Sequence, residues 1–472
     1  MAERLPALLG LDVGTTEAKA ALIGLDGRLL GLGRAGYPTD LGPGGRAEQD
    51  PRHWRAAVGE AVRAIDVAGA EILAICCVSQ GPTLVAVDAA GTPVRPAITW
   101  QDRRAGGSGF GLLPKMAWLA REDPDATARA AWLLPAWDAM GLWLSGEAAS
   151  SLQSHEAVPS DAELAGAGVR ASQVPPARPF GSRLGSLTVA AASVLGLPSG
   201  IPVVSGVNDG AASMLGAGLR VAGDAVDTGG TSGGIAIYAG HPVTLPVAGL
   251  YQAPAPIPGL WVVGGAMAAL GASVGWLFSA VLGDRWSAEE LFAEAASVPA
   301  GAEGLVFLPY LAGERAPIFD EGARGAFVGL TLAHGRAHLV RAVLEGAAFA
   351  MRHVAEPLAA AGAPATELRL AGRTSPADLW ARIKADVLGV PAVIPVVGET
   401  AVLGAAIIAA AGVGAMPSLE AGVASMAAVA RRLEPDPVVR LAYDEAFGRY
   451  LALYPALRPL LGPVGRAERE RP

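Results

Sequence analysis

The chain has 472 residues, with 36 Lys and Arg against 44 Asp and Glu, which gives a formal net charge of −8. This negative balance argues against nucleic acid as a partner, because neutralising phosphates requires a basic face. Hydrophobic residues make up 52% of the chain and charged residues 17%, which excludes a disordered protein and predicts large buried cores.

Two features bear on the compartment. Cys76 and Cys77 lie in the apolar run EILAICCVS, which favours a buried strand over a disulfide or a metal site. The first residues lack a signal-peptide pattern, and the longest uncharged apolar stretch, 401–416, is too short and too rich in Ala and Gly for a membrane span. We therefore expect a cytoplasmic protein with no membrane partner.

In chain order, the first elements are apolar runs that read as strands. Residues 8–12 and 19–23 predict two strands, and Asp26-Gly27 predicts a tight turn before a third. Helical spacing of apolar residues predicts a helix over 54–68, followed by a buried strand over 72–78. Strands that alternate with helices indicate an α/β architecture.

A repeat organises the whole chain. The sequence DVGTT from Asp12 is echoed by DTGGT from Asp227, about half the chain later, and an apolar run follows each. This position favours duplication, so we predict an N-terminal domain over 1–221 and a C-terminal domain over 222–462. We expect a ligand-binding cleft between them and a frayed tail over 463–472.

The two repeated turns have the composition of phosphate-binding loops. In the first, amides and hydroxyls of Gly14, Thr15 and Thr16 can cradle phosphate oxygens, and Asp12 can hold Mg²⁺. The alternative is an ordinary hairpin turn. The second turn, Asp227–Gly234, has so little side-chain bulk that its backbone can approach a ligand closely. Two such loops are what a kinase or an ATPase needs to hold a triphosphate.

Two further segments offer candidates for substrate chemistry. Asp209 follows the apolar run 201–204 and can act as a general base, or it can simply cap the helix that follows. The sequence WQDRR from Trp100 to Arg104 suits a polyhydroxylated substrate, because its carboxylate and amide bind hydroxyls and its ring can stack on a sugar. A solvated loop is the alternative.

The segment 313–351 combines a loop dense in charge with a helix. Its latter part, from His338, has the apolar spacing of a packed helix. Glu314, Arg315, Asp320 and Arg324 precede it, and charges at this density predict a paired network rather than a catalytic set.

Together these segments resemble the FGGY carbohydrate kinases over residues 10–412. The stretch 313–351 is similar to the family's signature, and 47–51, 114–119 and 379–391 are similar to other family segments. The resemblance implies an α/β fold of two duplicated actin/hexokinase-like (ribonuclease H-like) domains. It also implies transfer of the ATP γ-phosphoryl group to a hydroxyl of a small sugar or polyol, with Mg²⁺.

The resemblance also implies roles for individual residues. Asp209 is the expected catalytic residue, which accepts the hydroxyl proton and, with Asp12, lies near the metal. The expected substrate-binding residues are Gln80, Trp100, Asp102, Arg103 and Asp209. The expected nucleotide-binding residues are Asp12, Gly14, Thr15, Thr16, Lys19, Gly229, Gly230, Thr231, Ser232, Gly271, Gly372, Arg373 and Thr374.

The chain departs from the family pattern at two places. Gln80 is kept, but Gly81-Pro82-Thr83 follows it where family members often have a polar grip on the substrate. In the adenosine loop, Arg373 stands in place of a glycine and either stacks on adenine or crowds it. Because Asp102 is kept, a pentulose such as xylulose is the expected substrate. The alternatives are a glycerol, tetritol or sugar-acid (gluconate) kinase, or an actin-like sensor of sugar or nucleotide without significant turnover. Family analogy allows a homodimer.

Overall fold

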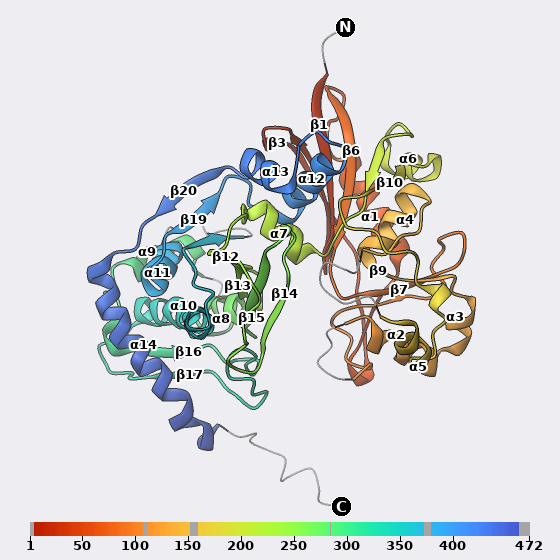
Figure 1. Cartoon of the computed structure of the whole chain (residues 1–472). Helices are drawn as coiled ribbons and strands as arrows, with labels where there is room; N and C mark the ends of the chain where they lie inside the picture. The colour runs from red at the N-terminus through yellow and green to blue at the C-terminus, as the bar shows by residue number, and fades with distance from the viewer. Residues whose placement is uncertain (1–3, 107–110, 152–158, 284, 372–378, 462–472) are drawn as a thin grey trace, which may run out of the picture. The chain divides into compact units, whose positions relative to one another are not determined.

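The computed structural model describes the chain in five stretches, residues 4–106, 111–151, 159–283, 285–371 and 379–461. The chain forms two compact units (Figure 1). Unit 1 comprises Met1–Gly218 and Glu399–Ala428, and unit 2 comprises Leu219–Gly398 and Val429–Pro472. A single boundary near residue 221 does not describe this division, because Glu399–Ala428 returns to unit 1. The tail predicted over 463–472 lies outside the described stretches.

Unit 1 is built on a mixed sheet with the strand order β10-β11-β6-β1-β2-β3. β1 pairs antiparallel with β2 and parallel with β6, and β6 pairs parallel with β11. The central strand β1 is apolar and buried from Ala7 to Val13, as a strand covered on both faces must be. The strands of this sheet are β1 (Leu5–Val13), β2 (Glu17–Gly24), β3 (Leu29–Gly36), β6 (Ala70–Ser79), β10 (Arg183–Ser186) and β11 (Pro202–Val204).

A second sheet and several helices complete unit 1. The second sheet has the order β4-β5-β8-β7-β9. Its strands are β4 (Asp40–Gly42), β5 (Arg46–Gln49), β7 (Leu84–Val87), β8 (Ala97–Ile98) and β9 (Trp132–Pro135). The α-helices are α1 (Pro51–Arg63), α2 (Leu113–Glu122), α3 (Pro124–Arg129), α4 (Ala136–Ser145), α5 (Asp161–Gly166), α6 (Val189–Leu195), α7 (Asp209–Ala217), α12 (Thr400–Gly412) and α13 (Leu419–Met426).

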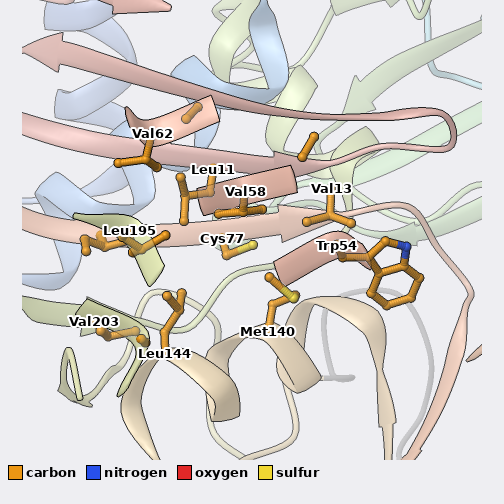
Figure 2. Packing of buried hydrophobic residues seen from close by; sticks show 14 of the residues in the cluster. Leu11, Val13, Trp54, Val58, Val62, Cys77, Met140, Leu144, Leu195 and Val203 are labelled. Atoms are coloured by element: carbon orange, nitrogen blue, oxygen red, sulfur yellow. The ribbon is translucent and has the colours of Figure 1, made fainter. Parts of the chain in front are cut away.

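The core of unit 1 lies between the first sheet and its covering helices. Trp54 and Val58 of α1, Leu11 of β1, Cys77 of β6 and Met140 of α4 belong to one buried cluster (Figure 2). Both cysteines are free and buried, as the apolar run predicted. Burial raises the pKa of the Cys76 thiol, so that this side chain acts as a small apolar residue.

Helix α1 differs from its predicted range, because it ends at Arg63 rather than near residue 68. It begins earlier as well, with the Asp50 side chain accepting a hydrogen bond from the Arg52 amide (2.9 Å). Beyond its end, the Asp66 carboxylate accepts from the Ala68 amide (3.0 Å), which stabilises a turn in place of further helix.

Helix α12 explains why residues 399–428 belong to unit 1. It packs against β1 and α7, and Figure 1 shows it in blue beside the red strand β1. The contact is made by backbone: an added Cβ at Gly10 would lie 2.2 Å from the Val402 carbonyl oxygen, and one at Gly404 would lie 1.8 Å from that of Ala212. Only glycine permits so close an approach.

Unit 2 has its own sheet, with the strand order β14-β15-β13-β12-β18-β19-β20. The strands of unit 2 are β12 (Asp224–Asp227), β13 (Gly234–Ala239), β14 (Leu250–Pro254), β15 (Trp261–Ala266), β18 (Glu367–Leu370), β19 (Ala392–Pro395) and β20 (Val429–Leu433), with the separate pair β16 (Val306–Leu308) and β17 (Ala326–Val328). Its α-helices are α8 (Leu270–Trp276), α9 (Ala288–Ala296), α10 (Arg336–Ala360), α11 (Leu379–Leu388) and α14 (Pro437–Leu457).

The two main sheets repeat one topology. In unit 1, β1 forms a hairpin with β2 and pairs parallel with β6; in unit 2, β12 forms a hairpin with β13 and pairs parallel with β18. Each parallel set continues by one strand, β11 or β19, and closes with an antiparallel one, β10 or β20. Asp12 lies next to last in β1 and Asp227 ends β12, the corresponding strand, so the predicted duplication is confirmed.

The charged loop before α10, for which a paired network was predicted, has the partners of its Glu314 and Asp320 side chains outside the loop or in backbone amides. Within the described residues, no salt bridge joins Glu314, Asp320, Arg315 or Arg324 to one another. Glu314 is buried, and its Oε1 accepts hydrogen bonds from the amides of Ala268 (2.9 Å) and Arg315 (2.7 Å). Asp320 accepts from the Tyr454 hydroxyl (2.6 Å) and pairs with Arg458 (3.2 Å). The predicted pairing is therefore found for Asp320, whereas backbone amides hold Glu314.

No helix within the described residues combines the length and the apolar character that crossing a bilayer requires.

Candidate active site

Two carboxylates lie near the same edge of the main sheet in unit 1. Asp12 is near the end of β1 and is 4% exposed, and its Oδ1 has no hydrogen-bond partner among the described residues. Asp209 is the first residue of α7, next to Asn208, which bridges to Ser79 at the end of β6. Because β6 lies beside β1, this bridge brings the start of α7 to the strand end that carries Asp12.

Asp209 is not the cap of its helix. Asn208 caps α7, with its Oδ1 accepting a hydrogen bond from the Ala211 amide (2.7 Å). Asp209 follows as the first helical residue, and its Oδ1 accepts from the adjacent Gly210 amide (2.8 Å). The capping alternative for Asp209 is therefore wrong: the preceding residue satisfies the helix end and leaves this carboxylate for another task.

The electrostatics of the pair follow from burial and proximity. Burial raises the pKa of Asp12 above its usual range, and the charge of Asp209 raises it further. Burial likewise raises the pKa of Asp209, against the lowering influence of the Gly210 amide and of Lys19. No described Lys, Arg or His side chain forms a salt bridge with either carboxylate, and two such acids within electrostatic reach form a site that favours a proton or a cation.

The predicted lysine, Lys19, is paired within unit 1. Its Nζ lies 3.0 Å from Oε2 of Glu399 and 3.7 Å from Oε1 of Glu17. Arg34 pairs with both of the same glutamates. Lys19 stands opposite Asp12 in the hairpin register and moderates its charge from there. The role of Glu399 was missed, because nothing local indicates that residue 399 returns to the first hairpin.

The first loop, Gly14-Thr15-Thr16, is held by its carbonyls and leaves amides free. The Tyr37 hydroxyl donates to the Gly14 carbonyl, and Gln49 Nε2 donates to the Thr15 carbonyl (2.7 Å). Within the described residues, the amides of Thr15 and Thr16 donate no hydrogen bond to the chain. These two groups are available to anionic oxygens.

Gln49, a buried residue beside the first loop, was assigned no role from the sequence. Besides the Thr15 carbonyl, its Nε2 donates to the Thr39 hydroxyl (2.7 Å). Its Oε1 accepts from Trp54 Nε1 (3.0 Å) and from Gln80 Nε2 (2.7 Å). One buried amide thus connects the first loop to the predicted substrate residue Gln80. The sequence signal for Gln49 was the segment AEQDP, which is similar to a family segment but had been given no role.

A cavity of about 580 Å³ in unit 1 lies beside the first loop. Thr15, Thr16 and Arg103 line it, so three predicted site residues are brought together there. The other lining residues are Thr39, Leu41, Gly42, Gly45, Arg46, Ala47 and Gln101. Trp100 stands next to this wall, with its Nε1 donating to the Thr15 hydroxyl (3.1 Å). Hydroxyls, an amide and guanidinium groups suit a polar acceptor.

Asp102 is turned away from this cavity. It is 2% exposed, and its carboxylate accepts from the Ala47 amide (2.9 Å) and from Arg104 Nη2 (2.6 Å). These partners hold the WQDRR loop against β5 and hold the pKa of Asp102 below its usual value despite burial. The Asp102 carboxylate therefore joins its loop to β5 and to Arg104, and a substrate contact at Asp102 stays a prediction.

The second loop follows β12 in unit 2. Gly229, Gly230 and Gly233 all have positive φ (61°, 78° and 82°), a conformation that favours glycine. The amides of Gly230, Thr231 and Ser232 donate to no acceptor within the described part of the chain. This loop therefore presents consecutive free donors, as the first one does.

Gly271 supports the second loop by its lack of a side chain. The amides of Leu270 and Ala272 donate to the carbonyls of Ser232 and Thr231 (both 2.9 Å), so the start of α8 is hydrogen-bonded to the loop. A Cβ at Gly271 would lie 2.2 Å from the Gly230 carbonyl oxygen. The predicted residues Gly372, Arg373 and Thr374 lie outside the described residues.

The carboxylates of Asp12 and Asp209 can supply some of the oxygen ligands of a magnesium ion. This ion usually takes only one or two carboxylates from a protein. Within the described stretches, no three His, Cys, Asp or Glu side chains come together as a metal site. Asp12 and Asp209 are a pair, with one buried oxygen of Asp12 unpartnered. Mg²⁺ commonly binds one or two carboxylates and completes its octahedron with water and phosphate oxygens, so the pair fits it.

Comparisons with known proteins identify the family. Residues 7–109 match the N-terminal domain of the FGGY family of carbohydrate kinases, and residues 225–413 match its C-terminal domain. The chain is 29% identical to a xylulose kinase of Lactococcus lactis subsp. lactis, over 88% of this chain and 89% of that protein. It is 32% identical to a glycerol kinase of Thermus brockianus, over 87% and 90%.

A solved structure extends the agreement to the fold. The xylulose kinase from Rhodospirillum rubrum superimposes with a TM-score of 0.85 at 30% identity, covering 96% of this chain and 99% of that one. The predicted fold class of two duplicated α/β domains is thereby confirmed. Matching domains, full-length relatives and a shared fold lead to one conclusion: the chain belongs to the FGGY family of carbohydrate kinases.

Proposed function

We propose that the protein transfers a phosphoryl group from ATP to a hydroxyl of a small sugar, with a pentulose such as xylulose as the first candidate. The observation that carries this proposal is the carboxylate of Asp209, which is freed from capping by Asn208. Burial raises its pKa, and a base whose pKa is raised toward neutrality suits proton transfer near pH 7. The names of two relatives, both xylulose kinases, favour the pentulose.

In this proposal Asp209 orients the acceptor hydroxyl and takes its proton as the phosphoryl group arrives. Asp12 and Asp209 would hold Mg²⁺, which when bound neutralises charge on the phosphate oxygens. Phosphoryl transfer depends on positioning and charge stabilisation more than on covalent chemistry of the protein. The free amides of Thr15 and Thr16, with those of Gly230, Thr231 and Ser232, are assigned to phosphate oxygens.

The cavity beside the first loop is assigned to the acceptor. Thr39 and Gln101 line it and offer hydrogen bonds to hydroxyls. Trp100 lies behind the lining residue Thr15, whose hydroxyl accepts from its Nε1 (3.1 Å). Arg103 favours a second candidate, a sugar-acid kinase. Within the described residues its guanidinium makes no hydrogen bond or ion pair, so it is free to bind a carboxylate.

A substrate panel tests the proposal. ADP release would be measured with Mg-ATP and, in turn, xylulose, glycerol, erythritol and gluconate. We expect the highest kcat/KM with the pentulose, and preference for gluconate would transfer the assignment to the sugar-acid kinase. Arg103→Gln is the matched variant, because it should lower kcat/KM for gluconate alone.

The panel has a result that contradicts the proposal. No turnover of any acceptor, in a protein that still binds ATP, would favour the actin-like sensor instead. Release of ADP at the same rate with and without every acceptor would likewise remove the acceptor site from the cavity in unit 1.

A further inference from the structure

The second loop stands on a buried ion pair that the proposed reaction leaves unexplained. Nζ of Lys384, on α11, lies 2.5 Å from Oδ2 of Asp227 at the end of β12. Both residues are buried, with 7% and 5% exposure. The same ammonium lies 3.8 Å from the ring of Trp380. Lys384 is therefore fixed in place, with its charge directed at one carboxylate.

A buried ion pair is weak evidence of stabilisation, because desolvating two charges can cost as much as their attraction returns. The other contacts of Asp227 indicate what the pair does. Its Oδ1 accepts from the Gly229 amide (2.9 Å), and its carbonyl accepts from the Ala371 amide (3.0 Å). Gly229 is the first of the left-handed glycines, so the carboxylate fixes the residue at which the loop turns.

This arrangement poses an electrostatic problem that Lys384 solves. The loop beyond Gly229 presents free amides for phosphate, yet a carboxylate forms its base. An uncompensated carboxylate there would repel an anionic ligand, and more strongly in a poorly solvated interior than in water. Lys384 cancels this charge while Asp227 keeps its hydrogen bond to the loop.

We propose that Asp227 and Lys384 are a positioning pair for the nucleotide phosphates. Asp227 fixes the turn at Gly229, and Lys384 removes the charge that would otherwise oppose phosphate at the amides of Gly230–Ser232. The proposal rests on the proposed nucleotide-binding role of this loop. It assigns to Lys384 a function in binding phosphate, exerted through Asp227, rather than a part in the chemistry.

The test compares ADP with adenosine, which lacks the phosphates, by isothermal titration of the full chain. Lys384→Met keeps the bulk of the side chain and leaves a bare carboxylate. It should weaken ADP binding about tenfold or more and leave adenosine binding unchanged. Lys384→Arg keeps the charge and is expected to restore ADP affinity. The double variant Asp227→Asn/Lys384→Met removes both charges and should bind ADP better than Lys384→Met alone.

Other outcomes overturn the proposal. Equal losses for ADP and adenosine in Lys384→Met would indicate a structural role only, and unchanged ADP affinity would indicate no role. If Lys384→Met does not fold, Asp227→Asn decides: it keeps an oxygen for the Gly229 amide and leaves a positive charge, so retained ADP affinity supports the pair and a tenfold loss contradicts it. If the wild-type protein binds ADP no better than adenosine, the nucleotide role of the loop itself fails.

Discussion

Asp12 and Asp227 hold the same place in the two units, at the end of the first strand of a hairpin, but their carboxylates differ in what faces them. Among the described residues, Asp12 Oδ1 has no hydrogen-bond partner, and the nearby Lys19 pairs with Glu399 (3.0 Å). Both oxygens of Asp227 are engaged, one by Lys384 (2.5 Å) and one by the Gly229 amide (2.9 Å). The two units share one strand topology, but only the Asp227 carboxylate is in direct contact with a lysine among the described residues.

The difference teaches which of two equivalent acids is available for chemistry. Burying an ionised carboxylate without a contacting cation is unfavourable in free energy. Binding a proton or a metal ion offsets this penalty. A carboxylate that already pairs with a lysine of the same chain needs no added cation, and it can instead accept hydrogen bonds that fix the backbone. On this account unit 1 supplies the acids of the reaction, and unit 2 supplies a neutralised loop.

The largest expected effect separates the chemical role of unit 1 from the positioning role of unit 2. Asp209→Asn should lower kcat by about 10²–10⁴-fold, because the hydroxyl loses its general base. Without Mg²⁺, ATP affinity should stay within about threefold of wild type, because within the described residues the amides of Thr15 and Thr16 donate no hydrogen bond to Asp209. Steady-state kinetics and isothermal titration measure the two quantities. Near-normal turnover in this variant would remove Asp209 from its assigned role.

A second prediction concerns how firmly the loop of unit 2 is held. Gly271→Ala places a Cβ 2.2 Å from the Gly230 carbonyl oxygen. It should lower the free energy of unfolding by about 1–3 kcal/mol and weaken ADP binding. An added Cβ at Gly275, on the same helix, would meet no described atom within 4 Å outside its own helix backbone and its two chain neighbours, which makes Gly275→Ala the matched control.

The control should behave in the opposite sense. Gly275→Ala is expected to leave ADP affinity unchanged and to gain up to about 1 kcal/mol from helix propensity. Denaturant unfolding and titration with ADP distinguish the two variants. Equal behaviour of the two alanines would show that the contact between α8 and the loop is unimportant.

The smallest expected effect concerns how the free energy of unfolding depends on pH when no divalent cation is present. Because burial and Asp209 raise the folded-state pKa of Asp12, its contribution to stability is full below the unfolded pKa of about 4 and is lost as pH rises toward and through the folded pKa. Asp12→Asn cannot ionise, so the fall in unfolding free energy between pH 5 and pH 8 should shrink by about 1–2 kcal/mol.

Urea unfolding in EDTA at several pH values measures this slope. If the unfolding free energy of Asp12→Asn falls with pH as steeply as that of wild type, then folding does not raise the pKa of Asp12.

Much of the fold was predictable because it is local. The apolar run of β1, the turn at Asp26-Gly27 and the repeated acid–glycine turns each depend on neighbouring residues. The return of 399–428 to unit 1 was not predictable, because it depends on backbone contacts such as Gly10 with Val402, far apart in sequence. Local patterns do not record such pairings.

The site divides in the same way. Asp12, Thr15 and the glycines of the second loop were found from their turns, whereas the partners that decide their charge were not. Lys384 lies more than a hundred residues from Asp227, and the sequence at 379–391 marked it only as part of a family-like segment. The sequence marked Asp209 as a candidate general base. It did not show that Asn208 caps α7, because Asp and Asn can both cap a helix.

The comparison between the two acids is tested most directly by the effect of Mg²⁺ on ADP affinity in three proteins. Isothermal titration with and without Mg²⁺ would be carried out on wild type, Asp12→Asn and Lys384→Met. The account predicts that Mg²⁺ strengthens ADP binding in wild type and in Lys384→Met, and that Asp12→Asn loses this gain. Full retention of the gain in Asp12→Asn, or its loss in Lys384→Met, would contradict the account.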